Sequence, residues 1–280
     1  AFWPDLEDLC HEALNGCYKE DELTTMLNSA IMKLLRKGEK CPLEAGNYRP
    51  ISLLSVFYKI GSGCITRRLE TVMEKVIGPQ QKAYSSTRNI GSILLNLLNM
   101  MDHVNKKKKE SLILLVDFKK AFDSINTKFR DSALELFNFG ESFRKWVRLF
   151  FSGRKTYLLL HGYLGDCINL EQGVPQGDVL SPYIFNICVE ILLLKICFTN
   201  TLTGVKFAKR EAGAECFADD TTVFIERTEE NLRALVKIIE DFARVSGLNA
   251  NLDKTMICPI GGNFSIKEED QMCQDLKLVW

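Results

Sequence analysis

Proteins that bind nucleic acid usually carry an excess of basic residues, and this sequence has none. Its 36 Lys and Arg residues are matched by 36 Asp and Glu residues, so the formal net charge is zero. Because phosphate backbones are bound mainly by Lys and Arg, composition alone argues against such a partner. The basic residues are nevertheless clustered, at Lys33-Arg36-Lys37-Lys40, at Arg67-Arg68 and at Lys106-Lys107-Lys108-Lys109.

The sequence also lacks a recognisable zinc motif. Its ten cysteines include no CxxC pair, and no Cys/His group has the spacing of zinc ligands. A structural zinc site is therefore not expected. Scattered cysteines of this kind are typical of reduced, buried thiols in an intracellular protein.

No apolar run is long and uninterrupted enough to predict a membrane span. The longest, residues 183–198, contains Asn186, Glu190 and Lys195, and no signal peptide is visible. Repeats and low-complexity linkers are absent as well. With 280 residues the chain can form one large domain or two lobes. It does not begin with Met and ends on an apolar run, so we expect it to be part of a longer polypeptide.

Two acidic clusters about a hundred residues apart are the most informative feature that is present. Asp117 follows the apolar run 112–116, and Asp219 follows the apolar residues 216–218. Short apolar runs rich in β-prone residues predict buried strands. Apolar residues resume directly after Asp220. The pattern therefore predicts a tight hairpin with two carboxylates at its tip.

Carboxylates held close together repel one another unless a cation neutralises them. Mg²⁺ is the expected cation, because it prefers oxygen ligands and keeps positions open for water and phosphate. Aspartates on strands around paired Mg²⁺ ions are typical of sites of phosphoryl and nucleotidyl transfer. The sequence therefore predicts such a site.

Periodicity predicts an α+β fold in which helices cover one face of an antiparallel sheet. Helices are expected over residues 5–37, 58–76, 90–104, 127–138, 143–152, 182–198 and 228–246. Strands are expected at 111–117, 204–208, 214–225 and 256–258, a hairpin over 156–170, and an extended segment within 46–55.

Five motifs occur in a fixed order over most of the chain. They are NYRPISLL (47–54), VDFKKAFD (116–123), QGVPQGDVLSP (172–182), FADDTTVF (217–224) and GLNANLDKT (247–255). Together they resemble the ordered motifs of a reverse transcriptase, specifically that of a non-LTR (LINE-type) retrotransposon. The likeness covers about residues 20–258.

This resemblance implies a right-hand polymerase. Fingers with an N-terminal helical extension would occupy residues 1–110, and a palm with an antiparallel sheet would occupy 111–265. Residues 266–280 would begin the connection to a thumb that this chain lacks. The full protein would carry an endonuclease elsewhere.

Roles implied by the resemblance fall first on the acidic clusters. Asp117 and Asp219 match aspartates that ligate two Mg²⁺ ions, for which Mn²⁺ can substitute. Asp220 matches a second aspartate that is less directly a ligand. Lys254 matches a lysine that protonates the leaving pyrophosphate, although alone it would be read as a solvent-exposed lysine. Asp123 fits a structural cap of the following turn better than a ligand.

Further implied roles concern the nucleotide and the template. Phe122 matches an aromatic gate that leaves no room for a 2′-hydroxyl; the alternative is a core phenylalanine. Gln176 and Gly177 match a loop that holds template or nucleotide; the alternative is a helix-entry loop without a ligand. Arg49 matches a fingers arginine that contacts template or triphosphate.

Other basic residues are weaker candidates, since each could equally be a surface charge: Lys59, Arg67, Arg68 and Arg88. The segment QKAYSSTRN (81–89) departs from the family pattern, because it lacks the Gly-Phe and the Gly-Arg-Ser that relatives often show. Ala83-Tyr84 and Thr87-Arg88 stand in their place.

The resemblance implies RNA-templated DNA synthesis from a primer 3′-hydroxyl, and target-primed synthesis in the living element. Expected partners are an RNA template, a DNA primer or nicked target DNA, and dNTPs, with no membrane. The expected location is the nucleus and the cytoplasm. Alternatives are a group II intron-like reverse transcriptase and a domesticated RNA-binding scaffold without polymerase activity. Phe122 argues against an RNA-dependent RNA polymerase.

Overall fold

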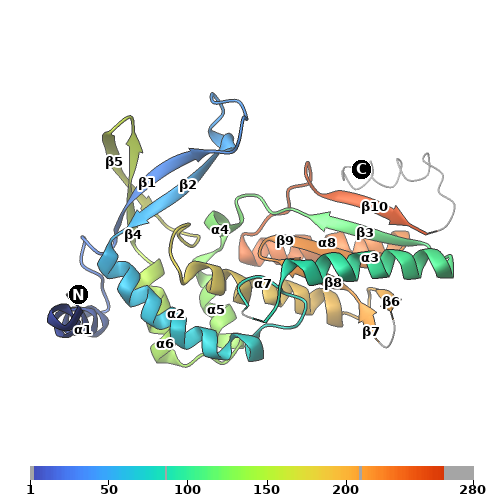
Figure 1. Ribbon diagram of the computed structural model, residues 1–280, viewed down its shortest axis with the longest axis horizontal. Coiled ribbons are helices and arrows are strands. Elements are labelled where there is room, and N and C mark those ends of the chain that lie inside the picture. Colours follow the sequence, from blue (N-terminus) through green and yellow to red (C-terminus); the bar gives the residue numbers. More distant parts are fainter. Residues whose placement is uncertain (1–2, 86, 208–209, 262–280) are drawn as a thin grey trace. The chain divides into compact units, whose positions relative to one another are not determined.

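The computed structural model describes residues 3–85, 87–207 and 210–261 (Figure 1). The chain divides into two compact units, and each unit joins two separate stretches of sequence. The first unit comprises Ala1–Val72 and Ile125–Ile184, and the second comprises Met73–Ser124 and Phe185–Trp280. The predicted boundaries near residues 110 and 265 remain a prediction, and residues 266–280 lie outside the described part.

The first unit combines helices with a mixed sheet. Its helices are α1 (Trp3–Glu20), α2 (Val56–Val76, which continues into the second unit), α5 (Thr127–Leu136) and α6 (Glu141–Phe151), with a short 3-10 helix η1 (Ala45–Asn47). Its strands are β1 (Ser29–Arg36), β2 (Tyr48–Leu54), β4 (Arg154–Leu160) and β5 (Tyr163–Leu170), in the order β2-β1-β4-β5. Strand β1 is antiparallel to β2 and parallel to β4.

The prediction of helix up to residue 37 is wrong for β1. Its residues Met32, Lys33, Leu34 and Leu35 all favour helix as isolated residues. The strand is bonded on both sides, to the next strand β2 and to β4, which lies far along the sequence. Long-range pairing therefore overrides the local helix preference.

The core of the first unit is built where α2 meets α6. Tyr58 is buried, its hydroxyl donates to the carbonyl oxygen of Phe150 at 2.8 Å, and the two rings meet edge to face at 5.0 Å. A Cβ at Gly61 would come within 2.8 Å of the Phe150 ring. The missing side chain at Gly61 therefore lets the two helices pack closely.

The second unit holds the other helices and a four-stranded antiparallel sheet. Its helices are α3 (Ile90–Lys107), α4 (Ala121–Ser124), α7 (Ser181–Phe198, which begins in the first unit) and α8 (Glu229–Ser246). The sheet has the order β10-β3-β9-β8, formed by β10 (Met256–Ile260), β3 (Ser111–Val116), β9 (Asp220–Glu226) and β8 (Ala214–Phe217). A separate pair consists of β6 (Val205–Phe207) and β7 (Arg210–Ala212).

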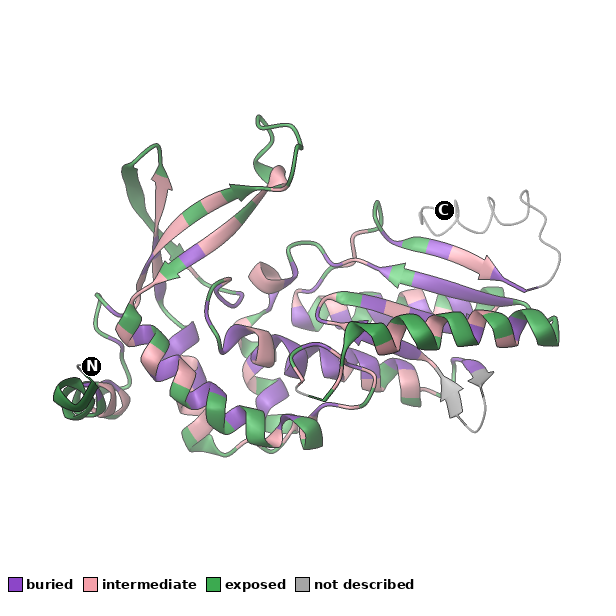
Figure 2. Cartoon of the chain, viewed as in Figure 1, coloured by how far each residue is buried: buried purple, intermediate pink, exposed green. Residues whose placement is uncertain are grey.

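Both faces of this sheet are buried around β3, whereas the sequence predicted helices on one face only. Helix α3 packs on one face through a cluster of Met100, Val104, Ile113, Phe224 and Ile260. Residues of β3 that point to the opposite face are buried as well: Leu112, Leu114 and Val116. Figure 2 shows buried residues along most of this strand, and α8 contacts the neighbouring β9. The continuous apolar run of β3, without alternation, is typical of a strand covered on both faces.

By length and composition, helix α7 could cross a membrane. However, 61% of its 18 residues, Ser181–Phe198, are buried inside the protein. Such burial is typical of a core helix. The helix prediction is also wrong for residues 21–28, which are turn and irregular chain after α1. Outside residues 21–37, the predicted helices and strands are confirmed, with bounds shifted by a few residues. The short elements η1, α4 and β7 were not predicted.

Candidate active site

The sheet of the second unit brings the predicted aspartates to one of its ends. Asp117 directly follows β3, and Asp220 is the first residue of β9. Val116 pairs with Thr221, so the register continues to place Asp117 beside Asp220. Asp219 lies in the turn between β8 and β9, where Phe217 pairs with Asp220. The predicted hairpin with two carboxylates at its tip is therefore confirmed.

The turn that carries Asp219 has an unusual backbone and a buried partner. Ala218 takes a left-handed conformation with φ of 58°. The side chain of Gln81, which is fully buried, accepts a hydrogen bond from the Ala218 N–H at 3.1 Å and donates to the Ala218 carbonyl at 3.3 Å. Sequence analysis did not assign Gln81 a role, although it is the first residue of the segment 81–89.

Asp117 is engaged by the loop that follows α8. Its Oδ2 accepts a hydrogen bond from Nδ2 of Asn251 at 2.9 Å and lies 3.5 Å from Nζ of Lys254. The backbone of the same Asn251 donates to the carbonyl of Asp117 at 2.7 Å. The Lys254 side chain is 57% exposed, so the ion pair stabilises the fold by less than about 1 kcal/mol.

This loop is fixed by backbone pairing, which explains the position of Lys254. Gly247 ends α8 in a left-handed conformation with φ of 80°. The N–H of Lys119 then donates to the carbonyl of Asn249 at 2.9 Å, and Phe118 forms an isolated bridge with Ala250. Sequence reasoning had noted the motif GLNANLDKT but missed Asn251, whose side chain and backbone both bond Asp117.

Phe122 lies on α4 and has one ring face occupied. It stacks on Phe185 of α7 with ring centroids 4.5 Å apart and planes 10° apart. Phe185 is fully buried, whereas Phe122 is partly exposed. The ring is thus neither an ordinary core residue nor a free surface residue, and its gate role stays a prediction. Asp123 also lies on α4, and the predicted cap stays a prediction.

Arg88 is an internal clamp and not the surface charge that was considered for it. Its guanidinium donates to the carbonyl oxygens of Gly78 at 2.6 Å, Gln81 at 2.9 Å and Ile77 at 3.2 Å. A half-buried arginine that bonds three carbonyls fixes the path of residues 77–81. This segment therefore has a structural function in the second unit.

Helix α7 holds the same segment from another side. Asn186 donates to the carbonyl of Ala83 at 3.0 Å, and Glu190 accepts from the N–H of Gly78 at 2.9 Å. Both side chains are buried. Burial raises the pKa of Glu190 to about 7, although the Gly78 N–H and the charge of Arg88 act in the opposite direction.

Gln176 and Gly177 belong to the first unit, on the loop that leads to α7. The carbonyl of Gln176 accepts from the N–H of Ser52 at 2.8 Å. Gly177 has φ of 120°, and a Cβ there would lie 2.6 Å from the Ser52 carbonyl oxygen. The close approach that the glycine permits is thus to strand β2. Arg49, also in the first unit, is exposed on β2.

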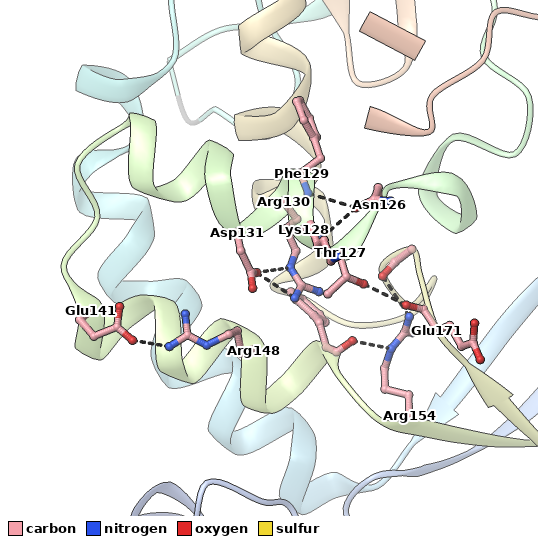
Figure 3. A network of polar contacts seen from close by, with 12 residues as sticks. Asn126, Thr127, Lys128, Phe129, Arg130, Asp131, Glu141, Arg148, Arg154 and Glu171 are labelled. Atoms are coloured by element: carbon pink, nitrogen blue, oxygen red, sulfur yellow. Dashed lines mark hydrogen bonds and ion pairs between the residues drawn. The ribbon is translucent and has the colours of Figure 1, made fainter. Parts of the chain in front are cut away.

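The start of the same loop is anchored by the polar network in Figure 3. Arg154 donates to the carbonyls of Gln172 at 2.9 Å and Gly173 at 3.0 Å, while the hydroxyl of Thr127 donates to the carbonyl of Glu171 at 2.9 Å. Arg154 is 6% exposed. These bonds satisfy its buried charge and fix the backbone before Gln176.

The acidic end of the sheet has a donor set that fits Mg²⁺. Among the described residues, no three His, Cys, Asp or Glu side chains form a ready cluster that could hold a metal ion. Mg²⁺ is commonly held by only one or two carboxylates together with water and substrate phosphates. Asp117 and the Asp219-Asp220 turn provide such carboxylates on adjacent strands. An ion bound through Oδ2 of Asp117 would lie close to Nζ of Lys254, which is 3.5 Å from that oxygen.

Comparison with protein families matches residues 35–268 to the family described as reverse transcriptase (RNA-dependent DNA polymerase). The transposon TX1 uncharacterized 149 kDa protein of Xenopus laevis is 25% identical over 91% of this chain and 19% of its own length. The Pol polyprotein of the type-2 retrotransposable element R2DM of Drosophila melanogaster is 28% identical over 77% of this chain and 20% of its own length.

A third relative is the RNA-directed DNA polymerase from mobile element jockey of Drosophila funebris. It is 26% identical over 71% of this chain and 21% of its own length. The chain therefore spans about a fifth of the length of the curated relatives it matches.

Solved structures similar to this chain include telomerases. Apo telomerase from Candida tropicalis, truncated from its C-terminal domain, superposes with a TM-score of 0.61 at 13% identity, covering 87% of this chain and 52% of that one. Telomerase from Candida albicans, in complex with a fragment of telomeric RNA, gives a TM-score of 0.60 at 13% identity, covering 90% and 45%. At this identity the likeness shows a shared polymerase fold.

Proposed function

Because the chain belongs to the reverse transcriptase (RNA-dependent DNA polymerase) family, of the type found in non-LTR retrotransposons, we propose that it copies RNA into DNA. It would add dNTPs to a primer 3′-hydroxyl as a nucleotidyltransferase. The observation that carries the proposal is the pairing of β3 with β9, which sets Asp117 beside the Asp219-Asp220 turn.

In this proposal, Asp117 and Asp219 hold two Mg²⁺ or Mn²⁺ ions, and Asp220 assists. Bound ions would lower the pKa of the primer hydroxyl and neutralise charge on the triphosphate. The primer 3′-oxygen would attack the α-phosphorus in line, and the bond to pyrophosphate would break. Lys254, already 3.5 Å from Asp117, would provide a proton for the leaving pyrophosphate.

Selection of deoxynucleotides would fall to Phe122. Its stacking on the buried ring of Phe185 supports this role, because a supported ring resists displacement by a 2′-hydroxyl. Contacts to template or nucleotide would come from the first unit, through Gln176 and Arg49, with Gly177 fixing the loop. RNA template, DNA primer or nicked target DNA, and dNTPs are the proposed partners.

In the living element, the proposed activity is target-primed synthesis at a nicked chromosomal site. A thumb and an endonuclease would be supplied by other parts of a longer polypeptide. A life cycle of this kind would require the protein in both the nucleus and the cytoplasm, which is the proposed location. Relatives named for retrotransposable elements and a mobile element favour this setting over a group II intron.

Primer extension on an RNA template tests the proposal. The intact chain and the Asp219→Asn/Asp220→Asn double variant are compared with Mg²⁺ and either dNTPs or rNTPs. Asp241→Asn is the control, because it neutralises an exposed aspartate of α8 that pairs with Arg244. We expect extension with dNTPs by the intact chain and the control, and a loss of at least about 100-fold in the double variant.

Extension with rNTPs at a similar rate would contradict the gate role of Phe122. Equal activity of the double variant would contradict the metal site. RNA binding that is independent of metal, without extension, would favour the scaffold alternative; a longer chain that includes the thumb is then tested in the same assay, and its inactivity would reject the polymerase proposal.

A further inference from the structure

We infer that Gln81 is a positioning residue of the metal site, which holds the Ala218-Asp219 turn in the geometry that presents Asp219. The inference rests on the proposed function and assigns a role to a side chain outside the acidic clusters. Gln81 is separated from the turn by 137 residues. It is fully buried, so it would act through Asp219 and would not touch the substrate.

The amide of Gln81 grips the peptide backbone on both sides of Ala218. Oε1 accepts the Ala218 N–H at 3.1 Å, and Nε2 donates to the Ala218 carbonyl at 3.3 Å. This carbonyl belongs to the peptide bond that leads into Asp219. The orientation of that peptide plane, and hence the direction of the Asp219 side chain, is therefore set by the Gln81 amide.

The turn needs such support for two physical reasons. Ala218 has a left-handed φ of 58°, a conformation that costs a residue with a Cβ roughly 1 kcal/mol. Asp219, Asp220 and the nearby Asp117 also carry charges of one sign, which repel when no cation is bound. Without a fixed partner, both effects would drive the turn towards other conformations.

Gln81 is itself fixed, as a positioning residue must be. Its Oε1 also accepts the N–H of Ala83 at 3.0 Å. Its flanking backbone pairs with β8: the N–H of Lys82 donates to Cys216 at 2.8 Å, and the N–H of Cys216 donates to Gln80 at 2.9 Å. Arg88 and α7 hold the same segment from the other side. The position of the Gln81 amide is therefore fixed by the contacts of its own backbone segment.

Two neighbours show that this segment faces the acidic turn. Burial, together with the negative charge of Asp219, raises the pKa of Tyr84, which lies three residues after Gln81. The buried thiol of Cys216 donates to the same Ala218 carbonyl at 3.0 Å and accepts from Nε2 of Gln81 at 3.3 Å. The carbonyl that precedes Asp219 thus has two donors.

The test compares Gln81→Met with a matched buried amide. Met keeps the length and removes every hydrogen bond of the amide. Asn231→Leu is the control, because Asn231 is a buried amide of the same unit that accepts the Thr203 N–H at 2.9 Å and donates to the Glu226 carbonyl at 3.1 Å. Glu226 is the last residue of β9, at the opposite end of the strand from Asp220. Both variants lose stability, but only Gln81→Met changes the acidic turn.

Binding of Mn²⁺ alone is measured by electron paramagnetic resonance, and the Mg²⁺ concentration for half-maximal primer extension is measured on the same samples. We expect Gln81→Met to raise the Mn²⁺ dissociation constant and the half-maximal Mg²⁺ concentration about 10-fold or more. Asn231→Leu should leave both within about twofold. If circular dichroism shows that Gln81→Met does not fold, Gln81→Asn is used instead. The Asn side chain is one methylene shorter, so its amide cannot bond Ala83 and Ala218 at the same time.

The outcomes separate the two hypotheses. Equal metal responses of the Gln81 and Asn231 variants, with an active intact chain, would overturn the positioning role and leave the polymerase intact. An inactive intact chain whose Mn²⁺ binding still depends on Gln81 would retain the positioning role, and the polymerase proposal would then be decided by the longer chain in the same assay. No Mn²⁺ binding by the intact chain would overturn the inference.

Discussion

At the scale of single residues, the surroundings of a side chain decide what a substitution costs. Gly177 and Gly63 both lie in the first unit, yet they differ sharply. A Cβ at Gly177 meets a backbone oxygen of Ser52 at 2.6 Å in a left-handed conformation, whereas at Gly63 the nearest atom is a Val179 methyl at 4.0 Å. One glycine is therefore required by geometry, and the other is not.

Gly177→Ala is expected to lower the free energy of unfolding by about 1–3 kcal/mol, since it adds strain to a fixed loop. Gly63→Ala, inside helix α2, should instead be neutral or stabilising by up to about 1 kcal/mol. Urea denaturation of both variants measures the difference. Equal stability of the two would show that the loop at Gly177 yields without cost.

Glu190 gives the stability of the protein a predictable dependence on pH. Its pKa is raised to about 7 in the folded protein, above its ordinary value in the unfolded chain. Between the two pKa values the folded state binds more protons, so stability falls as pH rises from about 4.5 to about 7 and is then constant. Below that window the carboxyl is neutral in both states and costs nothing.

Glu190→Gln should remove this slope, because the amide keeps an acceptor for the Gly78 N–H and cannot ionise. The wild-type loss across the window is on the order of 3 kcal/mol from this group. Urea denaturation of both proteins at pH 5 and pH 8 measures it. A slope that is the same in the variant would mean that other groups cause the pH dependence.

At the scale of elements, the β8-β9 hairpin carries a conflict between stability and function. Its register sets Asp220 beside Asp117, and like charges placed opposite each other destabilise a pair of strands. A bound cation would remove that repulsion. The residues that make the site useful are thus expected to weaken the sheet when no ion is bound.

Asp220→Asn is expected to raise the free energy of unfolding in EDTA by up to about 1 kcal/mol, and to reduce the additional stability gained from Mg²⁺. Asp241→Asn should not raise it, because that aspartate pairs with Arg244 on the surface of α8. Thermal unfolding with EDTA and with Mg²⁺ checks both. A destabilised Asp220→Asn protein in EDTA would mean that Asp220 has a structural role.

At the scale of the whole molecule, the two compact units do not follow the order of the sequence. Each combines two stretches, and α2 and α7 continue from one unit into the other. The core of the first unit depends on the packing of Tyr58 from the early stretch against Phe150 from the late one. A single cut in the chain therefore separates parts of one core.

A fragment of residues 1–110, the predicted fingers, is expected not to fold alone. It lacks α6 and β4, which provide the partners of Tyr58 and of β1. Near-ultraviolet circular dichroism and dispersion of its amide NMR signals measure this directly. A fragment with native-like dispersion would show that residues 1–110 form a domain independent of the contacts of Phe150.

The sequence by itself determined the features that depend on local order: the strand before Asp117, the hairpin with Asp219 and Asp220 at its tip, and most helices. Periodicity and turn chemistry act over a few residues, so these features can be read from the chain. Tertiary structure alone decided that β1 is a strand, that Arg88 is a clamp, that Asn251 bonds Asp117, and that Gln81 holds Ala218. Strand β1, Asn251 and Gln81 depend on partners far away in the sequence. Arg88 bonds carbonyls close to it in the sequence, but the segment that carries them is held by the distant helix α7. In each case packing, and not local preference, fixes the pairing.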